Sequence, residues 1–480
     1  TFLDIGSIMR TLDFEHIKDQ INFMRVDRVL NRTVGIIGMA RSGLAAARLV
    51  KRLGGRPFVS DFQDEDKLSS QIAELRQYEI EYEAGGHSDR LLENVDYLVV
   101  SPGVPGDIPI IVTAESRGVP VFSELELAYW LCDAQLEAIT GSNGKTTTTS
   151  LLGEIYKSAG FESATAGNIG YPLSEVSDSL SARAWVSLEV SSFQLERIFE
   201  FRPEIGMILN LTPDHLDRYG RFEDYAETKL RIAENMSARD NLIVNADDEY
   251  LCKLADDFPV RKVYFSRARK TLPGVYLEGD EIKYKIDEMT GSLGTVERIS
   301  IPGPHNLENA MAAGAAALLA GVSAETISDV FEQFPGVEHR LEYVATIDGV
   351  RFVNDSKATN VDSVWYALQS VAEKIVLILG GKYKGGDLER LNELITQKVR
   401  HIVLIGEATS RMREAYEPIV NLSRANSLEE AVRIGYEVAR ENDTVLLSPA
   451  CASFDMFRDY EHRGQVFKQA VRGLKNDEKE

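Results

Sequence analysis

Short apolar runs alternate with longer amphipathic segments along most of this 480-residue chain. Runs such as 33–37, 97–100 and 136–139 have the length of buried strands, and between them apolar residues recur at helical spacing. Strands that alternate with helices favour parallel sheets covered on both faces. The pattern therefore predicts an α/β fold whose domains are doubly wound, mostly parallel sheets.

The pattern repeats in three successive blocks, and 480 residues exceed what one hydrophobic core usually organises. Gly279-Asp280 and Asp348-Gly349 each lie between two short strands and predict hairpins. Ser427-Leu-Glu-Glu430 predicts a capping box that opens a helix. We expect an N-terminal extension over 1–29, a Rossmann-like domain over 30–123, a P-loop-like domain over 124–335 and a Rossmann-like domain over 336–480.

Charge and composition narrow the classes of protein to which this chain can belong. The formal net charge of −22 disfavours nonspecific binding to nucleic acids or anionic membranes. No apolar run approaches the roughly 20 residues that span a bilayer, and the first 30 residues scatter charges without the apolar core of a signal peptide. Three widely spaced cysteines fit no metal motif. We therefore expect a cytoplasmic protein with reduced thiols and neither nucleic acid nor membrane as a partner.

The stretch 138–147, Ala-Ile-Thr-Gly-Ser-Asn-Gly-Lys-Thr-Thr, follows a short strand and opens a helix. Its glycines let backbone N–H groups converge on phosphate oxygens, and the start of the helix adds its positive end. Lys145 supplies a charge for the β- and γ-phosphates, and Thr146 supplies a hydroxyl for Mg²⁺. Ile139 stands where the general P-loop pattern has its first glycine, so this loop is tighter. The residues expected to bind ATP here are Gly141, Ser142, Asn143, Gly144, Lys145, Thr146 and Thr147.

The first domain carries an imperfect dinucleotide-binding fingerprint. Gly38-Met-Ala-Arg-Ser-Gly43 follows a strand, but Ala40 replaces the middle glycine. Asp61 ends the next strand, where a dehydrogenase places its ribose-binding acid. Taken alone, this unit fits a generic β-α turn as well as it fits a nucleotide site.

Polar residues at other strand ends and helix starts leave two interpretations open. Glu189 ends a buried-looking strand and could hold Mg²⁺, or it could cap a helix or form an ion pair. His215 could bind a metal as neutral imidazole, or hydrogen-bond within its loop. Lys229 lies on an amphipathic helix, where a solvated lysine is the commoner role. Asn306 and Asn309, three residues apart, could reach an adenine or its sugar; alternatively, His305 or Asn306 could cap the helix.

Four strings together identify a family. The phosphate loop, Asp-His-Leu-Asp-Arg at 214–218, His-Asn-Leu-Glu-Asn at 305–309 and Asp-Ser-Lys-Ala-Thr-Asn at 355–360 resemble the Mur ligases, which are ATP-dependent amide ligases. The likeness covers about residues 30–475. It implies ATP and two Mg²⁺ ions as cofactors, and a carbamate on Lys229. The catalytic residues that it implies are Lys145, Glu189, His215 and Lys229, and the metal ligands are Thr146, Glu189, His215 and carbamylated Lys229.

The Asp-Ser-Lys-Ala-Thr-Asn string resembles the branch of the family that adds D-glutamate to UDP-N-acetylmuramoyl-L-alanine in cytoplasmic peptidoglycan precursor synthesis. The resemblance implies an acyl-phosphate intermediate and a monomeric enzyme. It adds Asn306, Asn309, Arg340 and Asp355 to the ATP-binding residues. For the UDP-sugar it implies Arg41, Ser42, Asp61, Gly103, Asn168 and Ser191, and for D-glutamate Lys357, Thr359, Lys384, Ser453 and Tyr460. Two places depart from the family pattern: Tyr460 stands where phenylalanine is expected, and Arg41-Ser42 where smaller or apolar residues also occur.

Three other functions compete with this one. Another Mur ligase or a folylpolyglutamate synthase would share the ATP motifs, and a panel of amino acids separates these enzymes. A nicotinamide-dependent oxidoreductase could be built on residues 38–61, although Ala40 and the downstream ATP motifs oppose it. A noncatalytic nucleotide switch would bind ATP without releasing phosphate in response to an amino acid.

Overall fold

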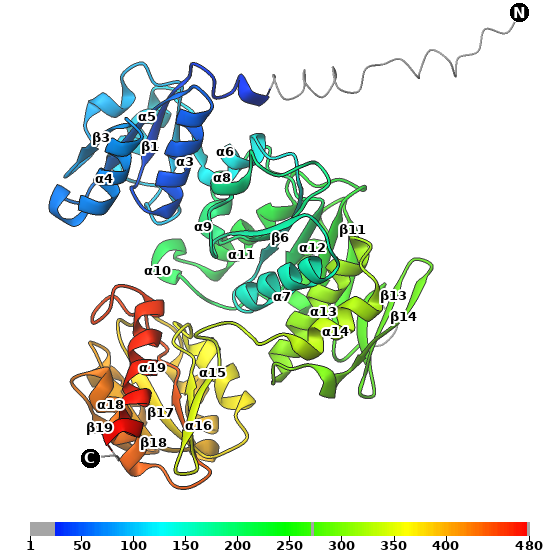
Figure 1. Cartoon of the computed structure of the whole chain (residues 1–480), viewed down its shortest axis with the longest axis vertical. Coiled ribbons are helices and arrows are strands. Elements are labelled where there is room, and N and C mark those ends of the chain that lie inside the picture. The colour runs from blue at the N-terminus through cyan, green and yellow to red at the C-terminus, as the bar shows by residue number, and fades with distance from the viewer. Residues whose placement is uncertain (1–24, 270–272, 478–480) are drawn as a thin grey trace, which may run out of the picture. The chain divides into compact units, whose positions relative to one another are not determined.

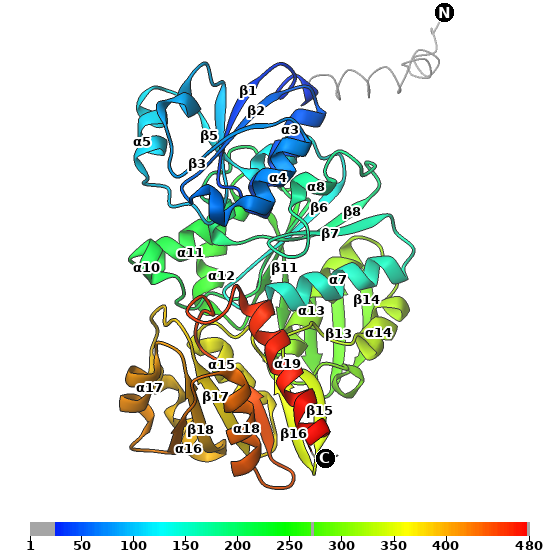
Figure 2. The ribbon, with the colours of Figure 1, turned by 60° about the vertical axis from the view of Figure 1, so that its left-hand side comes forward.

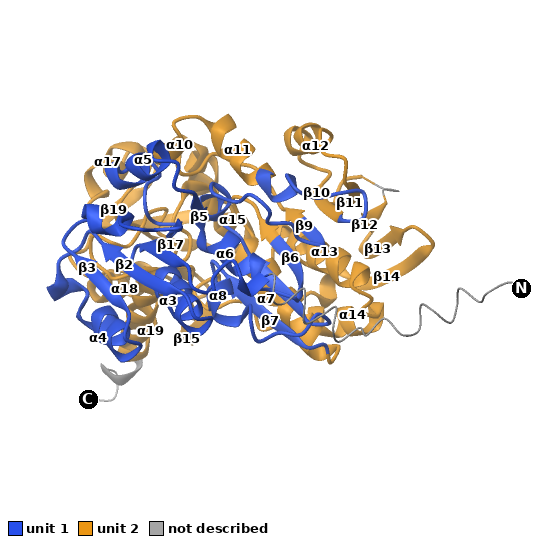
Figure 3. Cartoon of the chain, turned by 90° about the horizontal axis from the view of Figure 1, so that it is seen from above, with its two compact units in different colours: residues 1–138, 161–206, 231–240 blue, residues 139–160, 207–230, 241–480 orange. Residues whose placement is uncertain are grey.

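The computed structural model describes residues 25–269 and 273–477 (Figure 1; Figure 2 gives a second view), so most of the predicted N-terminal extension lies outside the described residues. By its internal contacts the chain divides into two compact units (Figure 3). The first unit holds the chain up to Ala138, Phe161–Gly206 and Arg231–Asp240, and the second holds Ile139–Gly160, Met207–Leu230 and the chain from Asn241 onward. Within the described ranges, every helix falls short of the length or the apolar character needed to span a bilayer.

The first unit begins with a parallel sheet in the order β3-β2-β1-β4-β5. Ile36 and Ile37, neighbours on β1, are fully buried in separate cores on opposite faces of this sheet. A Cβ on Gly43 would lie 1.9 Å from the carbonyl oxygen of Gly38, so glycine is required where the helix starts against the strand. The strands are β1 (Thr33–Ile37), β2 (Arg56–Asp61), β3 (Glu81–Ala84), β4 (Tyr97–Val100) and β5 (Val121–Ser123), and the helices are α3 (Arg41–Arg52), α4 (Ser69–Gln77), α5 (Pro109–Ser116) and α6 (Glu124–Trp130).

The second sheet has the strand order β14-β13-β12-β11-β10-β9-β6-β8-β7. Two of its strands, β6 (Gln135–Thr140) and β9 (Ile205–Ile208), run from the first unit into the second. The first unit also holds β7 (Ser163–Gly167), which is parallel to β8 (Trp185–Glu189), and the short helices α8 (Leu173–Val176) and α9 (Ser192–Leu195).

In the second unit, β10 to β12 are parallel and β12 to β14 are antiparallel, which confirms the hairpin predicted at Gly279-Asp280. Helix α13 is alanine-rich and almost wholly buried, and it packs against α7 (Figure 2). The strands are β10 (Asn241–Asn245), β11 (Arg261–Ser266), β12 (Gly274–Glu278), β13 (Glu281–Ile286) and β14 (Met289–Thr295). The helices are α7 (Lys145–Ser158), α10 (Leu216–Tyr219), α11 (Phe222–Leu230), α12 (Glu249–Ala255), α13 (Pro304–Leu319) and α14 (Ala324–Gln333).

The third sheet, also in the second unit, has the order β15-β16-β20-β17-β18-β19. Its only antiparallel pairing among the described strands is the predicted hairpin of β15 and β16. Ser427 caps α18 as predicted, but Glu430 accepts the backbone N–H of Asn426 instead of completing a capping box with Ser427. The strands are β15 (Glu342–Ile347), β16 (Val350–Asn354), β17 (Ile375–Gly380), β18 (Val399–Ile405), β19 (Asn421–Arg424) and β20 (Thr444–Leu447), and the helices are α15 (Val361–Ser370), α16 (Asn392–Lys398), α17 (Thr409–Tyr416), α18 (Leu428–Val438) and α19 (Tyr460–Asp477).

The predicted α/β class is therefore confirmed, with mostly parallel sheets. The parallel order also explains how distant polar residues come together. Asp355, Gly381 and Ser448 directly follow β16, β17 and β20, which are parallel neighbours. Residues that follow the carboxyl ends of neighbouring parallel strands lie at one edge of the sheet, where α/β proteins place their ligands.

Candidate active site

The phosphate loop connects β6 to α7 and is shaped by two glycines. Gly144 has a φ of 87° directly before the first turn of α7, and a Cβ there would lie 2.2 Å from Oδ1 of Asn309. Lys145 folds back on its own loop, and its Nζ donates to the carbonyl oxygens of Gly141 over 2.7 Å and Ser142 over 2.9 Å. The ammonium group is therefore held beside the loop in which phosphate oxygens are expected.

Asn210, which follows β9, braces this loop. Its Oδ1 accepts the backbone N–H of Asn143 over 2.9 Å, and its Nδ2 donates to the carbonyl oxygen of Asn143 over 3.1 Å. The backbone N–H of Ser142 also donates to the Asn210 carbonyl oxygen over 3.0 Å. Sequence reasoning gave Asn210 no role, although its position at a strand end beside the loop was a usable signal.

The paired asparagines of α13 face the phosphate loop. Asn309 Nδ2 donates to Asn306 Oδ1 over 3.2 Å, and the Thr148 hydroxyl donates to Asn309 Oδ1 over 3.3 Å. The interpretation of Asn306 as a helix cap is wrong, because Gly303 occupies the N-cap and no side chain caps the helix. Burial, with smaller contributions from Arg340 and Arg267, lowers the pKa of the neighbouring His305 to about 3, so this imidazole is neutral at working pH.

A small cavity lies among the phosphate loop, α13, α15 and the start of the third sheet. Its lining includes Asn143, Gly144, Asn309, Arg340 and Asp355, all expected to bind ATP. The cavity measures about 20 Å³, little more than one water molecule needs. A nucleotide bound at these residues would have to displace side chains. The lining also includes Thr147, from the same prediction, together with Asn210, His305, Glu308, Leu341, Ser363, Tyr366 and Ala367.

Asp355 is the buried acid of this nucleotide cavity. Burial raises the pKa of its carboxyl group to about 6, although Arg340 acts in the opposite direction. Its Oδ1 accepts the backbone N–H of Leu341 over 3.2 Å, and its Oδ2 accepts the Ser448 hydroxyl over 2.8 Å. The carboxylate thus fixes the backbone directly after Arg340.

Lys229 is 1 % exposed, so the interpretation of a solvated surface lysine is wrong. Its Nζ donates to the carbonyl oxygen of Gly141 over 2.9 Å and lies 4.6 Å from the centre of the Tyr225 ring. Thr146, the other metal ligand expected from the loop region, is also buried. The structure therefore places Lys229 against the phosphate loop, 88 residues from Gly141 in sequence.

His215 has a left-handed backbone, with a φ of 54°, directly before α10. Burial lowers the pKa of its imidazole, and Lys384, Lys145 and Lys229 lower it further against the opposing effect of Asp214. A neutral imidazole is the form that binds metals.

Glu189 lies in the first unit, at the end of β8, and is 1 % exposed. Its Oε1 accepts the Asn168 amide over 2.8 Å. The interpretation of Glu189 as a helix cap is wrong, because Ser191 caps α9 in a complete capping box with Gln194. Glu189 and Asn168 are thus brought together within the first unit, whereas Thr146, His215 and Lys229 belong to the second.

A cavity of about 290 Å³ lies beside His215 in the second unit. Lys384, expected to bind D-glutamate, lines it together with His215, Asp214 and Asn360. Arg390 also lines it and pairs with Asp362 over 2.9 Å. Sequence reasoning missed this arginine, which lies in the short 3₁₀ helix Leu388–Leu391 after Gly385-Gly386, with no motif around it.

The other residues expected to bind D-glutamate do not line that cavity. Lys357 donates to the Tyr460 hydroxyl over 3.2 Å, and its Nζ lies 4.9 Å from the centre of the Tyr460 ring. The hydroxyl that distinguishes Tyr460 from the expected phenylalanine therefore holds Lys357. Ser453 is 2 % exposed, and Thr359 is half-buried.

The first unit contains a cavity of about 490 Å³ at the carboxyl edge of its parallel sheet. Five of the six residues expected to bind the UDP-sugar line it, namely Arg41, Ser42, Asp61, Gly103 and Asn168. Ser191 does not; its hydroxyl bonds to Gln194. Asp61 is engaged locally, since its Oδ2 accepts the Met39 backbone N–H over 2.7 Å.

Phe62 and His87 also line this cavity and were missed by sequence reasoning. Phe62 is 73 % exposed, which is unusual for a phenylalanine directly after a buried strand end. His87 Nδ1 lies 2.7 Å from the Ser60 hydroxyl. An apolar residue after the strand-ending Asp61 was the available signal for Phe62.

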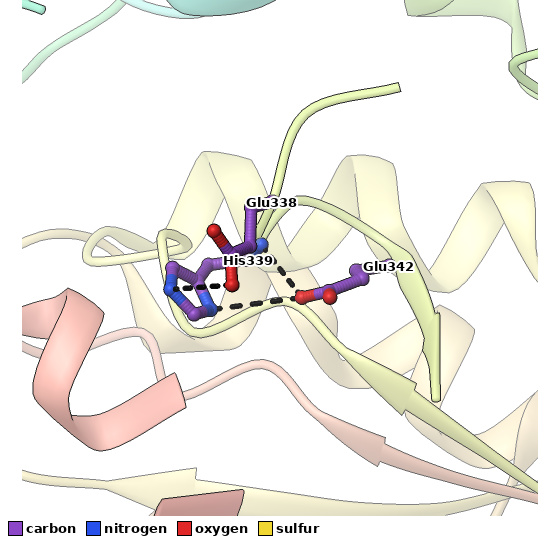
Figure 4. Close-up of side chains that lie close together, drawn as sticks. All are labelled: Glu338, His339 and Glu342. Carbon is purple, nitrogen blue, oxygen red and sulfur yellow. Dashed lines mark hydrogen bonds and ion pairs between the residues drawn. The ribbon is translucent and has the colours of Figure 1, made fainter. Parts of the chain in front are cut away.

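A separate cluster joins possible metal ligands at the start of the third sheet. Figure 4 shows Glu338, His339 and Glu342 turned toward one another, with one ligand atom from each within 4.8 Å of the others. Lys468 forms ion pairs with both carboxylates, at 2.9 Å from Glu342 Oε1. The Asn354 amide donates to Glu342 Oε2 over 3.0 Å. Because a lysine already supplies the positive charge, this cluster is an ion-pair network rather than a metal centre.

Three protein families match successive parts of the chain. The MurD-like N-terminal domain of Mur ligases matches residues 32–123, the Mur ligase middle domain matches 139–317, and the glutamate ligase domain of Mur ligases matches 339–451. These regions correspond to the three blocks of the sequence pattern.

Relatives and solved structures agree with these matches. The chain is 42 % identical over 451 residues to the UDP-N-acetylmuramoylalanine--D-glutamate ligase of Koribacter versatilis, covering 94 % of this chain and 99 % of the relative. It is 41 % identical over 448 residues to the enzyme of the same name from Thermoanaerobacter pseudethanolicus, covering 92 % and 99 %. The fold is similar to that of the UDP-N-acetylmuramate-alanine ligase MurC from Thermotoga maritima, with a TM-score of 0.60 at 21 % identity, covering 92 % of this chain and 99 % of that one. A pseudomurein peptide ligase type C from Methanothermus fervidus gives 0.59 at 19 % identity, covering 92 % and 100 %.

Proposed function

This chain belongs to the Mur ligase family, and we propose that it adds D-glutamate to UDP-N-acetylmuramoyl-L-alanine with hydrolysis of ATP, in peptidoglycan precursor synthesis. The observation that carries the proposal is the near full-length identity to relatives named for this activity. The second unit supports it, because one cavity joins Lys384 to His215 and another joins the phosphate loop to Asp355.

The proposed reaction solves a leaving-group problem. A free carboxylate does not form an amide at neutral pH, because hydroxide leaves poorly. An oxygen of the L-alanine carboxylate therefore attacks the γ-phosphorus of ATP, and the bond to ADP breaks. The amine of D-glutamate then attacks the carbonyl carbon of the acyl phosphate, and inorganic phosphate leaves. Positioning and charge neutralisation supply most of the rate in phosphoryl transfer.

Lys145 is suited to the first step. Its ammonium already lies 2.7 Å from the carbonyl oxygen of Gly141 and 2.9 Å from that of Ser142, so a short movement exchanges carbonyl oxygens for phosphate oxygens. The N-terminus of the 14-residue helix α7 adds its positive end at the same place. Asn306, Asn309, Arg340 and Asp355 would hold the remainder of the nucleotide.

Two Mg²⁺ ions would neutralise the phosphates, and the donor set suits them. Thr146 offers a hydroxyl, Glu189 a carboxylate, and His215 an imidazole that burial keeps neutral. Lys229 is buried against the phosphate loop, and a carbamate on its Nζ would convert an ammonium into an anionic oxygen ligand. A buried amine must lose its proton before it reacts with carbon dioxide, so bicarbonate dependence of activity tests this modification.

The 490 Å³ cavity of the first unit would bind the UDP part of the substrate. The N-terminus of α3 carries Arg41 and Ser42, which line the cavity and suit the diphosphate. Phe62 offers an exposed ring on which a uracil could stack. Asn168, which also lines this cavity, donates to Glu189 over 2.8 Å within the same unit.

D-Glutamate carries two carboxylates and one amine, so its site needs cationic donors at separated points. Lys384 would bind one carboxylate in the 290 Å³ cavity. Lys357, held by Tyr460, would serve the incoming amino acid, with hydroxyls from Thr359 and Ser453. We further propose that the enzyme is a cytoplasmic monomer, with its domains divided at residues 123 and 335.

Phosphate release tests the proposal directly. With ATP, Mg²⁺ and UDP-N-acetylmuramoyl-L-alanine present, D-glutamate is expected to trigger release, whereas L-glutamate, L-lysine, meso-diaminopimelate and L-alanine are not. Release with another amino acid would assign the chain to a different ligase. Nucleotide binding without any amino-acid-dependent release would indicate a noncatalytic switch.

A further inference from the structure

The first turn of α15 contacts both loops that carry the phosphate and metal chemistry. The Ser363 hydroxyl donates to Oδ1 of Asn143, in the phosphate loop, over 2.8 Å. The Asn360 amide donates to Oδ2 of Asp214, the neighbour of His215, over 3.1 Å. These contacts join residues 220 and 146 positions apart, so no local pattern could indicate them.

The two contacts belong to one network. Asn360 is the N-cap of α15, and its Oδ1 accepts the backbone N–H of Ser363 over 2.8 Å. Ser363 therefore uses its backbone N–H to start the helix and its hydroxyl to hold Asn143. Ser363 is 5 % exposed and Asn143 is 9 % exposed, so water cannot readily replace either partner.

The contact with Ser363 occupies the oxygen end of the Asn143 amide. With Oδ1 accepting from Ser363, the donor end is Nδ2. This nitrogen is buried, and among the residues that the structure describes it has no hydrogen-bond partner. Asn143 also lines the nucleotide cavity. A buried donor without a partner, on a residue that lines a ligand site, is suited to an acceptor on the ligand, and phosphate oxygens are strong acceptors.

We propose that Ser363 is a positioning residue for the nucleotide, which fixes the Asn143 amide so that Nδ2 donates to a phosphate oxygen of ATP. The proposal deepens the function proposed above and rests on it in taking ATP as the ligand. Through Asn360, the same turn holds Asp214 beside His215. One turn of a helix from the glutamate-ligase domain thereby sets two loops of the ATP-binding domain.

Binding of ATP and of adenosine to the purified full-length chain separates positioning from mere stability. Ser363→Ala is expected to weaken ATP binding about tenfold by calorimetry, because the amide of Asn143 loses its fixed orientation. Adenosine, followed by ligand-observed NMR, is expected to bind within twofold of wild type, because it carries no phosphate. Equal losses for both ligands, or no loss for ATP, would overturn the proposal.

A double-mutant cycle distinguishes an effect that acts through Asn143 from a packing change caused by loss of the Ser363 hydroxyl. In the Asn143→Ala background, Ser363→Ala is expected to change ATP binding less than twofold, since the amide that it orients is gone. Two independent, multiplying losses would contradict the proposal. Asn360→Ser retains a helix cap while removing the amide to Asp214, so it is expected to leave ATP binding within threefold.

These binding measurements need no turnover, so their outcome is separable from that of the proposed function. If D-glutamate fails to trigger phosphate release while Ser363→Ala still weakens ATP selectively, the reaction is wrong and the positioning role stands. If release occurs as expected and Ser363→Ala binds ATP normally, the positioning role is wrong and the reaction stands.

Discussion

The cavity of the first unit and the nucleotide cavity of the second differ in volume and in the hydrogen bonds that their polar groups form with one another. The first measures about 490 Å³, within the range of ordinary ligand pockets. The second measures about 20 Å³, and around it Thr148 bonds to Asn309 while Lys145 bonds to the carbonyl oxygens of Gly141 and Ser142. The first cavity can receive a nucleotide-sized group as it stands, whereas the second must exchange internal hydrogen bonds for bonds to phosphate.

This difference predicts where substitutions act most strongly. In the closed site, each polar group holds another in place, so removing one also misplaces its partners. In the open cavity, a lost side chain costs mainly its own contact with the ligand.

Lys145→Ala is expected to lower kcat/KM for ATP by about 10³-fold or more, because it removes the charge directed at the transferred phosphate. The melting temperature should stay close to that of wild type, since Lys145 is only half-buried. Lys157→Ala is the matched control, because this lysine lies on the same helix with a side chain that is 76 % exposed. Near-normal turnover by a folded Lys145→Ala enzyme would rule out the proposed role.

Lys229→Ala is expected to lose about 10²-fold or more in kcat and to recover part of it with added short-chain carboxylic acids. Such acids can occupy the place of the carbamate in the vacated volume beside Gly141. Lys145→Ala serves as the control that acids should not rescue. Full activity with an unmodified Lys229, established by ¹³C-bicarbonate labelling and mass spectrometry, would contradict carbamylation.

Lys384→Ala is expected to raise the KM for D-glutamate by about tenfold to a hundredfold, since a charged hydrogen bond contributes roughly 1.5–3 kcal/mol. The KM for ATP should change little. Lys382→Ala is the control, two residues away with an exposed side chain. An unchanged KM for D-glutamate would show that the 290 Å³ cavity is not the amino-acid site.

Phe62→Ala is expected to raise the KM for the UDP-sugar about fivefold or more, because stacking of a base on an aromatic ring contributes roughly 1–3 kcal/mol. The KM values for ATP and D-glutamate act as internal controls. Phe62→Tyr should restore most of the affinity, as it keeps the ring. If Phe62→Ala binds the UDP-sugar normally, the base does not stack there.

Asp355→Asn tests how much the buried, ionised carboxyl group of Asp355 lowers the stability of the folded chain. The pKa of Asp355 is raised from 3.8 to about 6, so the folded chain binds its proton more tightly than the unfolded chain does. The penalty of ionising this carboxyl group grows as pH rises from about 4 to 6 and is complete above 6. The melting temperature of Asp355→Asn is therefore expected to exceed that of wild type by a few degrees at pH 8, with the difference vanishing near pH 4. A constant difference across this range would be the contradicting result.

The sequence predicted the strands better than the helix starts. The runs 33–37 and 97–100 match β1 and β4 because turns bound each apolar run on both sides. Helix α13 begins at Pro304, six residues before its continuous apolar stretch, and residues of its first two turns line the nucleotide cavity. The spacing of apolar residues indicates the buried face of a helix, but it does not predict a polar turn that lines a binding site.

Motifs placed the candidate residues on the correct elements but did not give their burial or partners. The sequence alone favoured a surface position for Lys229, because the phosphate loop that buries it lies 88 residues away along the chain. Ser363 and Phe62 belong to no motif, since their roles follow from what the fold places opposite them. Conversely, Ser191 matched the family pattern, yet its hydroxyl is engaged in a capping box rather than lining the cavity.

Transfer of an oxygen isotope shows whether ATP activates the L-alanine carboxylate of the UDP-sugar for attack by D-glutamate. When both carboxylate oxygens of UDP-N-acetylmuramoyl-L-alanine are ¹⁸O, the acyl phosphate carries one of them to phosphorus. The account predicts one ¹⁸O atom in each phosphate released, detected by mass spectrometry, and one retained in the new amide. Unlabelled phosphate released together with the amide product would contradict it.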